Sequence, residues 1–244
     1  MRKMPKERGI LRLNLDAVER SLSGVQRDWH IIESELSNRS IGKKDAPFNS
    51  LLKERMIAAY NHLDTLLRDG VRPFSEESIM EMCRLNEYVH YGDDKSLRRE
   101  HSQAIAANEE KYYRNIIPIV KWHKSHTKDA PHPLKVASEV YVAILGYPQL
   151  FIEGNHRTGS IIASWIDLYY GHPPFVLGSE NAVSYFEPSA EIKFFADKST
   201  WRGKAQLPKY NKIFKQFWEA HIDWQFVLNP GTDYVKEGTE QGKE

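Results

Sequence analysis

The stretch Tyr147-Pro-Gln-Leu-Phe-Ile-Glu-Gly-Asn-His-Arg-Thr-Gly159 joins the end of one apolar segment to the start of another. Downstream of it, the apolar residues between Ser160 and Tyr170 recur at three- and four-residue spacing, which predicts a helix. Gly171 follows where glycine commonly ends a helix. The sequence therefore predicts a loop that leads into a helix N-terminus.

The middle of this loop, Glu153 to Arg157, combines an acid, a glycine, an amide and two bases. A helix N-terminus exposes unpaired N–H groups and the positive end of the helix dipole, which together favour an anion such as phosphate. Gly154 has no Cβ, so it can adopt positive φ and let a ligand approach the backbone. Asn155 is predicted either to cap the helix or to bind a phosphate oxygen. The guanidinium of Arg157 matches phosphate oxygens.

The carboxylate of Glu153 would by itself repel a polyphosphate. It fits the same site if it holds a magnesium ion that bridges to the phosphates. The alternative for all five residues is an ordinary loop with a helix cap and a surface ion pair, since short motifs often match by chance.

The loop resembles the signature of the Fic family, H-x-F-x-D/E-G-N-x-R-x-x-R. The positions that match in identity and spacing are Phe151, Glu153, Gly154, Asn155 and Arg157. Two positions differ, because Gln149 stands in place of the family histidine and Ser160 in place of the second arginine. A weaker resemblance extends over residues 75–175.

Fic proteins are helical and move a phosphate-containing group, usually AMP from ATP, onto a hydroxyl of a target protein. The resemblance implies an all-α, Fic-like helical bundle with a central anion-binding loop, ATP and Mg²⁺ as cofactors, and a nucleotide and a target protein as partners. It also implies roles for individual residues: Glu153 binds the metal, Gly154, Asn155, His156 and Arg157 bind the nucleotide phosphates, and Phe151 anchors the loop in the core.

The family histidine takes the proton of the target hydroxyl, and the amide of Gln149 cannot do so. A general base typically contributes about 10²–10⁴-fold to the rate. The resemblance therefore predicts a catalytically impaired pseudoenzyme that still binds its nucleotide. One alternative is an active nucleotidyl- or phosphotransferase that uses another base such as His156, because imidazole titrates in the useful range. A second alternative is a helical interaction or regulatory module.

The composition is that of a globular protein with a single sizeable core. The chain has 244 residues, 41% hydrophobic and 27% charged, and a net charge of +1. This charge gives no reason to expect nucleic acid or membrane as partners. Cys83 is the single cysteine, which fits a reducing compartment, and no signal peptide is recognisable, so we expect a cytoplasmic protein.

We expect three parts: an N-terminal tail and helix (1–47), a Fic-like helical core (48–228) and a flexible C-terminal tail (229–244). Helical periodicity or helix signals predict helices over 15–36, 49–69, 75–90, 116–126, 133–145, 190–195 and 210–227. The last of these is rich in aromatic residues and leaves room for a homodimer face.

Two further expectations come from the resemblance. Residues 91–113 lie where Fic proteins carry a strand-like hairpin flap that holds the target, although a solvated loop fits the sequence equally well. Many Fic proteins also carry an inhibitory helix with the pattern S/T-x-x-x-E-G/N. In the nearest match, only Glu33 agrees with this pattern, so a core-packing helix with a solvated Glu33 is the default.

Overall fold

The structure is a computed structural model that describes residues 9–39, 47–126 and 132–228. In these ranges the chain forms nine α-helices and one short 3-10 helix, and β-pairing is limited to isolated bridges. The prediction of an all-α protein is therefore confirmed. None of the described helices combines the length and apolar composition that crossing a membrane requires.

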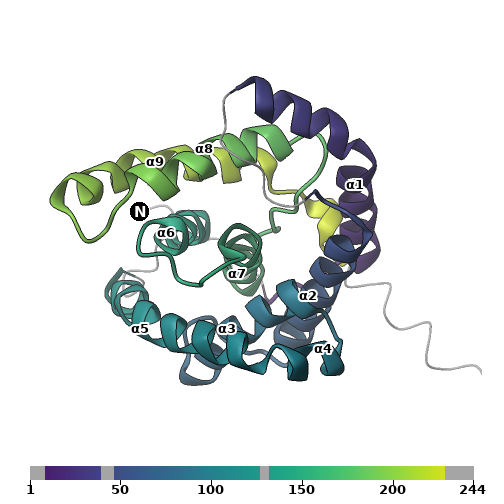
Figure 1. The fold of residues 1–244 in the computed structure, drawn as a ribbon, viewed down its shortest axis with the longest axis horizontal. Coiled ribbons are helices and arrows are strands. Elements are labelled where there is room, and N and C mark those ends of the chain that lie inside the picture. Colours follow the sequence, from purple (N-terminus) through teal and green to yellow (C-terminus); the bar gives the residue numbers. More distant parts are fainter. Residues whose placement is uncertain (1–8, 40–46, 127–131, 229–244) are drawn as a thin grey trace, which may run out of the picture.

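Two helices, α6 and α7, form the centre of the molecule (Figure 1). Helix α6 spans Pro133–Leu145 and helix α7 spans Asn155–Tyr169, and they pack closely against each other. Most of the residues of α7 are buried, because this helix is largely apolar around its whole circumference. The loop that joins the two helices, residues 146–154, is the stretch with the Fic-like motif and is called the motif loop below.

The other helices surround this central pair. Helices α2 and α3 pack against α7, α9 packs against α6, and α1 packs against α2 and α8. Their bounds are α1 Leu15–Asn38, α2 Ser50–Arg68, α3 Glu76–Tyr91, α4 Lys95–Glu100, α5 Ser102–His126, α8 Ala182–Phe195, α9 Trp201–His221 and the 3-10 helix Trp224–Phe226.

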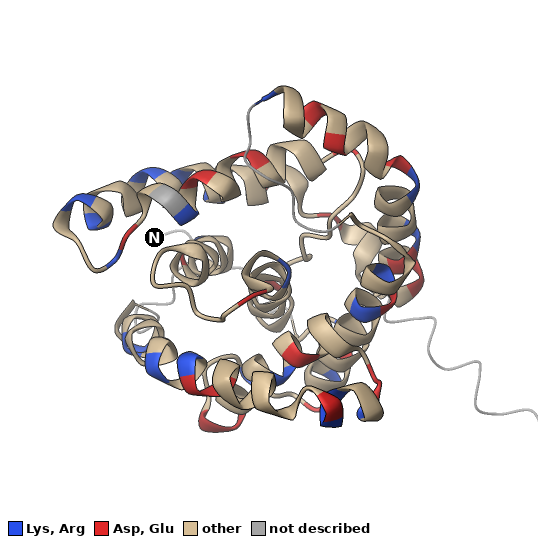
Figure 2. Ribbon diagram, viewed as in Figure 1, with Lys and Arg blue, Asp and Glu red and all other residues tan. Residues whose placement is uncertain are grey.

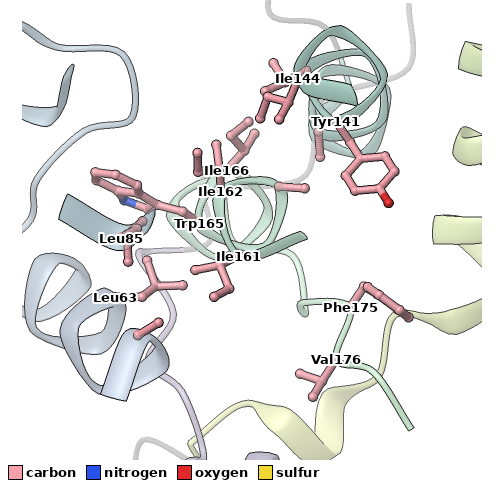
Figure 3. Packing of buried hydrophobic residues seen from close by; sticks show 14 of the residues in the cluster. Leu63, Leu85, Tyr141, Ile144, Ile161, Ile162, Trp165, Ile166, Phe175 and Val176 are labelled. Carbon is pink, nitrogen blue, oxygen red and sulfur yellow. The ribbon is translucent and has the colours of Figure 1, made fainter. Parts of the chain in front are cut away.

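The core is built around α7, as Figure 3 shows. Trp165 and Ile161 of this helix lie beside Leu63 and Leu85, which come from α2 and α3. Burying side chains of this size contributes roughly 1.5–3 kcal/mol each. This packing fixes α7, and with it the position of its N-terminus.

Charged residues lie mainly on the outer helices, and the central pair carries few of them (Figure 2). Asp167 on α7 is an exception, since it is fully buried. Burial raises the pKa of its carboxyl well above the usual range, and the nearby indole N–H of Trp218, which does not reach hydrogen-bond geometry, offsets this only in part. Asp167 is therefore protonated over a wider pH range in the folded protein than in the unfolded chain.

The predicted hairpin flap at residues 91–113 is wrong, because this region is helical. Asp94 caps α4 by accepting hydrogen bonds from the backbone N–H groups of Ser96 and Leu97. Helix α5 then begins at Ser102, and its first turns are rich in the good helix formers Ala, Gln, Glu and Lys. The sequence did not predict a helix here, because this surface segment is polar and its few apolar residues do not repeat with helical period.

Four predicted helices (15–36, 49–69, 75–90 and 133–145) agree with α1, α2, α3 and α6 within two residues. The C-terminal helices differ more. Helix α8 begins at Ala182, earlier than predicted. Helix α9 begins at Trp201 and continues through Pro208, and it ends at His221, before the residues of the 3-10 helix. The predicted tail 229–244 lies outside the described residues.

Candidate functional site

The motif loop ends at Gly154, which is the N-cap of α7 and has left-handed backbone angles (φ 73°, ψ 11°). A Cβ at this position would lie 2.6 Å from Nε2 of His90 and 2.9 Å from Nδ2 of Asn86. Glycine is therefore required both by the backbone conformation and by the space. No side chain caps α7, so the N–H groups of its first turn are not satisfied by a capping side chain.

Asn155 is the first residue of α7 and not its cap, so the predicted capping role is wrong. Its side chain is buried, with 4% exposure. Its Oδ1 accepts a hydrogen bond from the backbone N–H of Phe151 at 2.9 Å, and its Nδ2 donates to the carbonyl of Phe151 at 3.0 Å. The Asn155 amide therefore closes the loop upon itself. Its predicted contact with a phosphate oxygen stays a prediction.

Three polar side chains on one face of α5 bind the backbone of the motif loop. The bonds are Asn108 Oδ1 with the N–H of Ile152 at 2.9 Å, Lys111 Nζ with the carbonyl of Phe151 at 2.7 Å, and Asn115 Nδ2 with the carbonyl of Gln149 at 2.9 Å. The spacing of three and four residues places them on the same side of the helix. This row was missed by the sequence analysis, which had assigned part of α5 to a flap or loop.

Asn86 on α3 is a second anchor of the loop, and it is also buried. Its Nδ2 donates to the carbonyl of Glu153 at 3.0 Å and to Oγ1 of Thr158 at 2.9 Å. Its Oδ1 accepts from Nδ2 of Asn108 at 2.9 Å. One amide thus connects α3, α5, the loop and α7, and the loop is held from two sides.

Phe151 is fully buried and stacks on the ring of Tyr112, with 5.3 Å between the ring centroids and 10° between the ring planes. It lies in the core behind the loop, in the place that the resemblance implied. The side chain and the backbone of the loop are thus both fixed, which preorganises the N-terminus of α7.

Arg157 lies in the first turn of α7, and its Nη1 donates to the carbonyl of Val89 in the last turn of α3 at 3.3 Å. His90, which follows Val89 in α3, has a pKa that is lowered by burial and by the charge of Arg157. A hydrogen bond to the backbone of Glu153 raises this pKa and offsets part of the shift. Ser160 donates its hydroxyl to the carbonyl of Arg157 at 2.9 Å. Its side chain therefore serves the helix backbone and supplies no cation in place of the arginine of the family motif.

Glu153 is exposed at the same end of α7. No basic side chain of the described ranges forms an ion pair with its carboxylate. No group of three or more His, Cys, Asp or Glu residues in the described part of the chain is arranged to hold a metal ion. Any magnesium ion held by Glu153 would therefore need further ligands from a bound phosphate or from water, which is common for Mg²⁺.

The two candidate catalytic residues lie in different surroundings. Oε1 of Gln149, at the position of the family histidine, is 3.5 Å from Nδ2 of Asn155. His156 is half-buried on α7, its carbonyl accepts a hydrogen bond from the hydroxyl of Tyr185 at 2.8 Å, and its Nδ1 is shielded from solvent. Gln149 is therefore part of the hydrogen-bonded motif loop, whereas the backbone carbonyl of His156 is bonded to Tyr185 of α8.

Two hollows of the surface lie away from the loop. One, of about 470 Å³, is lined by residues at the end of α8 and in the first half of α9. The other, of about 490 Å³, lies between α1 and the start of α8. The lining of neither hollow includes a residue of the motif loop.

A scan against protein-family models, a search of curated proteins and a search of solved structures each return no match to this chain. The site is therefore interpreted from its own geometry and from the motif.

Proposed function

We propose that this protein is a Fic-like protein that binds a nucleotide phosphate together with Mg²⁺ at Glu153–Arg157. Because Gln149 occupies the position of the base, we propose that it is impaired in transferring AMP or a related group to a target hydroxyl. The observation that carries this proposal is the N-terminus of α7, which has no side-chain cap, begins at a left-handed Gly154 and is held by a preorganised loop.

Anion binding follows from the local charge. The N-terminus of a helix carries a partial charge equivalent to about +0.5, and its first N–H groups point outward along the axis. Arg157 adds a full positive charge in the first turn, and the absence of a Cβ on Gly154 lets phosphate oxygens reach the backbone. A hydrogen bond to a charged group is worth roughly 1.5–3 kcal/mol, so a few of them support measurable binding.

The exposed carboxylate of Glu153 is suited to a magnesium ion that shares its coordination with phosphate oxygens and water. Such an ion would neutralise charge on the bound phosphates. The described residues supply a place for one protein ligand, and the remaining ligands would come from the nucleotide and from water.

Transfer to a hydroxyl needs a group that accepts the hydroxyl proton. The Gln149 amide does not accept protons near neutral pH, and losing a base costs about 10²–10⁴-fold in rate. An active transferase that uses His156 is the alternative. Because Nδ1 of His156 is shielded from solvent, a proton would have to be accepted at Nε2 in that role.

The test is calorimetric titration with ATP and Mg²⁺, combined with transfer of label from α-labelled ATP. We expect wild type to bind MgATP and to transfer no label, and Gln149→His to bind equally and to gain self- or substrate labelling. Arg157→Gln should weaken binding at least tenfold, whereas the exposed Arg99→Gln on α4 should not.

Thermal unfolding of Arg157→Gln separates lost binding from lost stability, since Arg157 also bonds to α3. Nucleotide affinity that is unchanged in a folded Arg157→Gln variant would contradict the proposal. Labelling by wild type that His156→Ala abolishes would establish the alternative base.

A further inference from the structure

Two edges of the molecule meet beside the motif loop. On one side, Asn115 of α5 donates to the carbonyl of Gln149 at 2.9 Å. On the other, the backbone N–H of Lys198, in the connection from α8 to α9, donates to the carbonyl of Tyr147 at 2.6 Å. The two carbonyls belong to residues only two positions apart, whose Cα atoms lie at most about 7 Å from each other, so both edges contact the same short part of the loop.

Both edges are basic. Residues 111–126 contain four Lys or Arg and no Asp or Glu, and residues 193–209 contain five Lys or Arg and one Asp, in a chain whose net charge is only +1. We call these two segments the basic rim. Figure 2 shows blue segments at the corresponding ends of α5 and of the pair α8 and α9.

Several of these cations are not neutralised by the protein. Lys121, Arg202 and Lys204 are exposed, and no carboxylate of the described residues pairs with them. The guanidinium of Arg202 lies over the ring of Trp201, 5.4 Å from its centroid. The rim therefore presents positive charge to solvent.

The same edges and the loop between them carry exposed apolar side chains. Of the eleven large apolar residues that are exposed in the described chain, six lie on the rim or the motif loop. They are Tyr113, Ile117, Tyr147, Ile152, Phe195 and Trp201, and Trp201 is 76% exposed. Tyr113 and Ile117 lie one turn apart on α5, and Phe195 and Trp201 flank the connection from α8 to α9, so each edge carries a pair of exposed apolar side chains.

The hollow of about 470 Å³ belongs to this surface. Phe195, Arg202 and Lys209 are among its lining residues. The lining also contains Asp197 and Glu191, and Glu191 pairs with Lys209 at 3.8 Å, so Arg202 is the cation that the hollow offers to a carboxylate beside the apolar Phe195.

We propose that the basic rim docks an acidic segment of a partner protein, with aromatic or aliphatic side chains between its carboxylates, across the mouth of the motif loop beside Gln149. Charge complementarity selects the acidic chemistry. The exposed aliphatic side chains of Ile117 and Ile152 favour a peptide with apolar side chains over the phosphate backbone of a nucleic acid. This inference rests on the proposed function, in which the nucleotide is bound at the same loop and a partner segment beside it.

The probe is a fluorescently labelled poly(Glu,Tyr) copolymer, with poly(Glu) of equal length and a single-stranded DNA oligonucleotide as comparisons. At about 50 mM salt, where surface charges are weakly screened, we expect wild type to bind poly(Glu,Tyr) more tightly than the other two. The triple variant Lys121→Glu/Arg202→Glu/Lys204→Glu should weaken this binding at least tenfold.

A matched control reverses three exposed cations outside the rim, Arg20→Glu/Arg68→Glu/Lys95→Glu, with the same change in net charge. It should weaken binding less than threefold. Equal weakening in both variants, or no binding by wild type, would overturn the proposal. Tighter binding of the oligonucleotide that the rim variant abolishes would assign the surface to nucleic acid instead.

The two variants distinguish the docking surface from the nucleotide site. Arg157→Gln should leave poly(Glu,Tyr) binding unchanged, and the rim variant should leave MgATP binding unchanged. Wild type that binds the copolymer but not MgATP would therefore refute the proposed function and leave the docking surface, while wild type that binds MgATP but not the copolymer would do the reverse.

Discussion

The motif loop and the basic rim are neighbours with opposite construction. The motif loop is held by polar groups that face inward. The side-chain amides of Asn86, Asn108 and Asn155 form hydrogen bonds with the loop backbone, and Asn86 and Asn108 also bond to each other. On the rim, charged and aromatic side chains such as Arg202 and Trp201 face solvent. The loop is held in one conformation by hydrogen bonds, whereas the rim exposes the surface that we propose a partner covers.

This difference predicts whether a substitution changes the stability of the protein or its binding to a partner. A change in the loop should cost stability and alter a single geometry, whereas a change on the rim should leave the fold intact and alter binding.

Gly154→Ala should have the largest effect on stability. Its Cβ would lie 2.6 Å from Nε2 of His90, and alanine would also have to adopt a φ of 73°. We expect a loss of about 3 kcal/mol in the free energy of unfolding, measured by denaturant titration. Gly70→Ala is the matched control, since its φ is 71° and its nearest neighbour is 4.0 Å away, so it should cost only about 1 kcal/mol. Equal costs for the two would mean that the His90 contact is not tight.

Asn155→Ala should cost about 2 kcal/mol, because it leaves the backbone N–H of buried Phe151 without the partner Asn155 Oδ1 and removes one of the two bonds to its carbonyl. Asn115→Ala should cost less than Asn155→Ala, since Asn115 makes a single bond to a partly buried part of the loop. Chemical denaturation measures both. A reversed order would show that the loop is fastened mainly by α5.

Asp167→Asn tests the buried carboxyl of the core. Because the folded pKa is raised above that of the unfolded chain, about 3.9, this group favours the folded state most below that pH and progressively less as the pH rises through the folded pKa. Asparagine does not titrate, so the variant should gain stability relative to wild type as the pH increases from 4 to 7. Thermal unfolding across this range measures the difference, and a difference independent of pH would contradict the raised pKa.

Lys198→Met gives the smallest expected effect and addresses a rim lysine that turns inward. Its ammonium donates to the carbonyl of Ala143 near the end of α6, and burial lowers the pKa of its side chain from 10.5 to about 8. The unfolded chain therefore binds more protons than the folded protein between pH 8 and 10.5, and wild type should gain stability relative to the variant as the pH rises through that window. A difference between wild type and Lys198→Met that stays constant from pH 8 to 10.5 in thermal unfolding would contradict the lowered pKa.

Elements with a regular apolar pattern or a compact motif could be predicted from the sequence, and polar surface elements could not. Four helices were placed within two residues, since their buried faces repeat with helical period and Ser75 and Pro133 mark two of their starts. The loop before α7 was predicted because Gly154 and its neighbours form a compact motif. Helix α5 was only partly placed, because its first turns bury few apolar residues and so show no periodicity.

By itself, the sequence determined the all-α class, the position of the motif loop at a helix N-terminus, and the presence there of an acid, a glycine and an arginine. Local spacing and backbone freedom suffice for those conclusions. Only the tertiary structure decided that Asn155 turns inward, that Arg157 bonds to the end of α3, and that two basic segments about eighty residues apart border one loop. These facts depend on which helices pack together, and that is set by long-range burial of apolar surface and not by any local pattern.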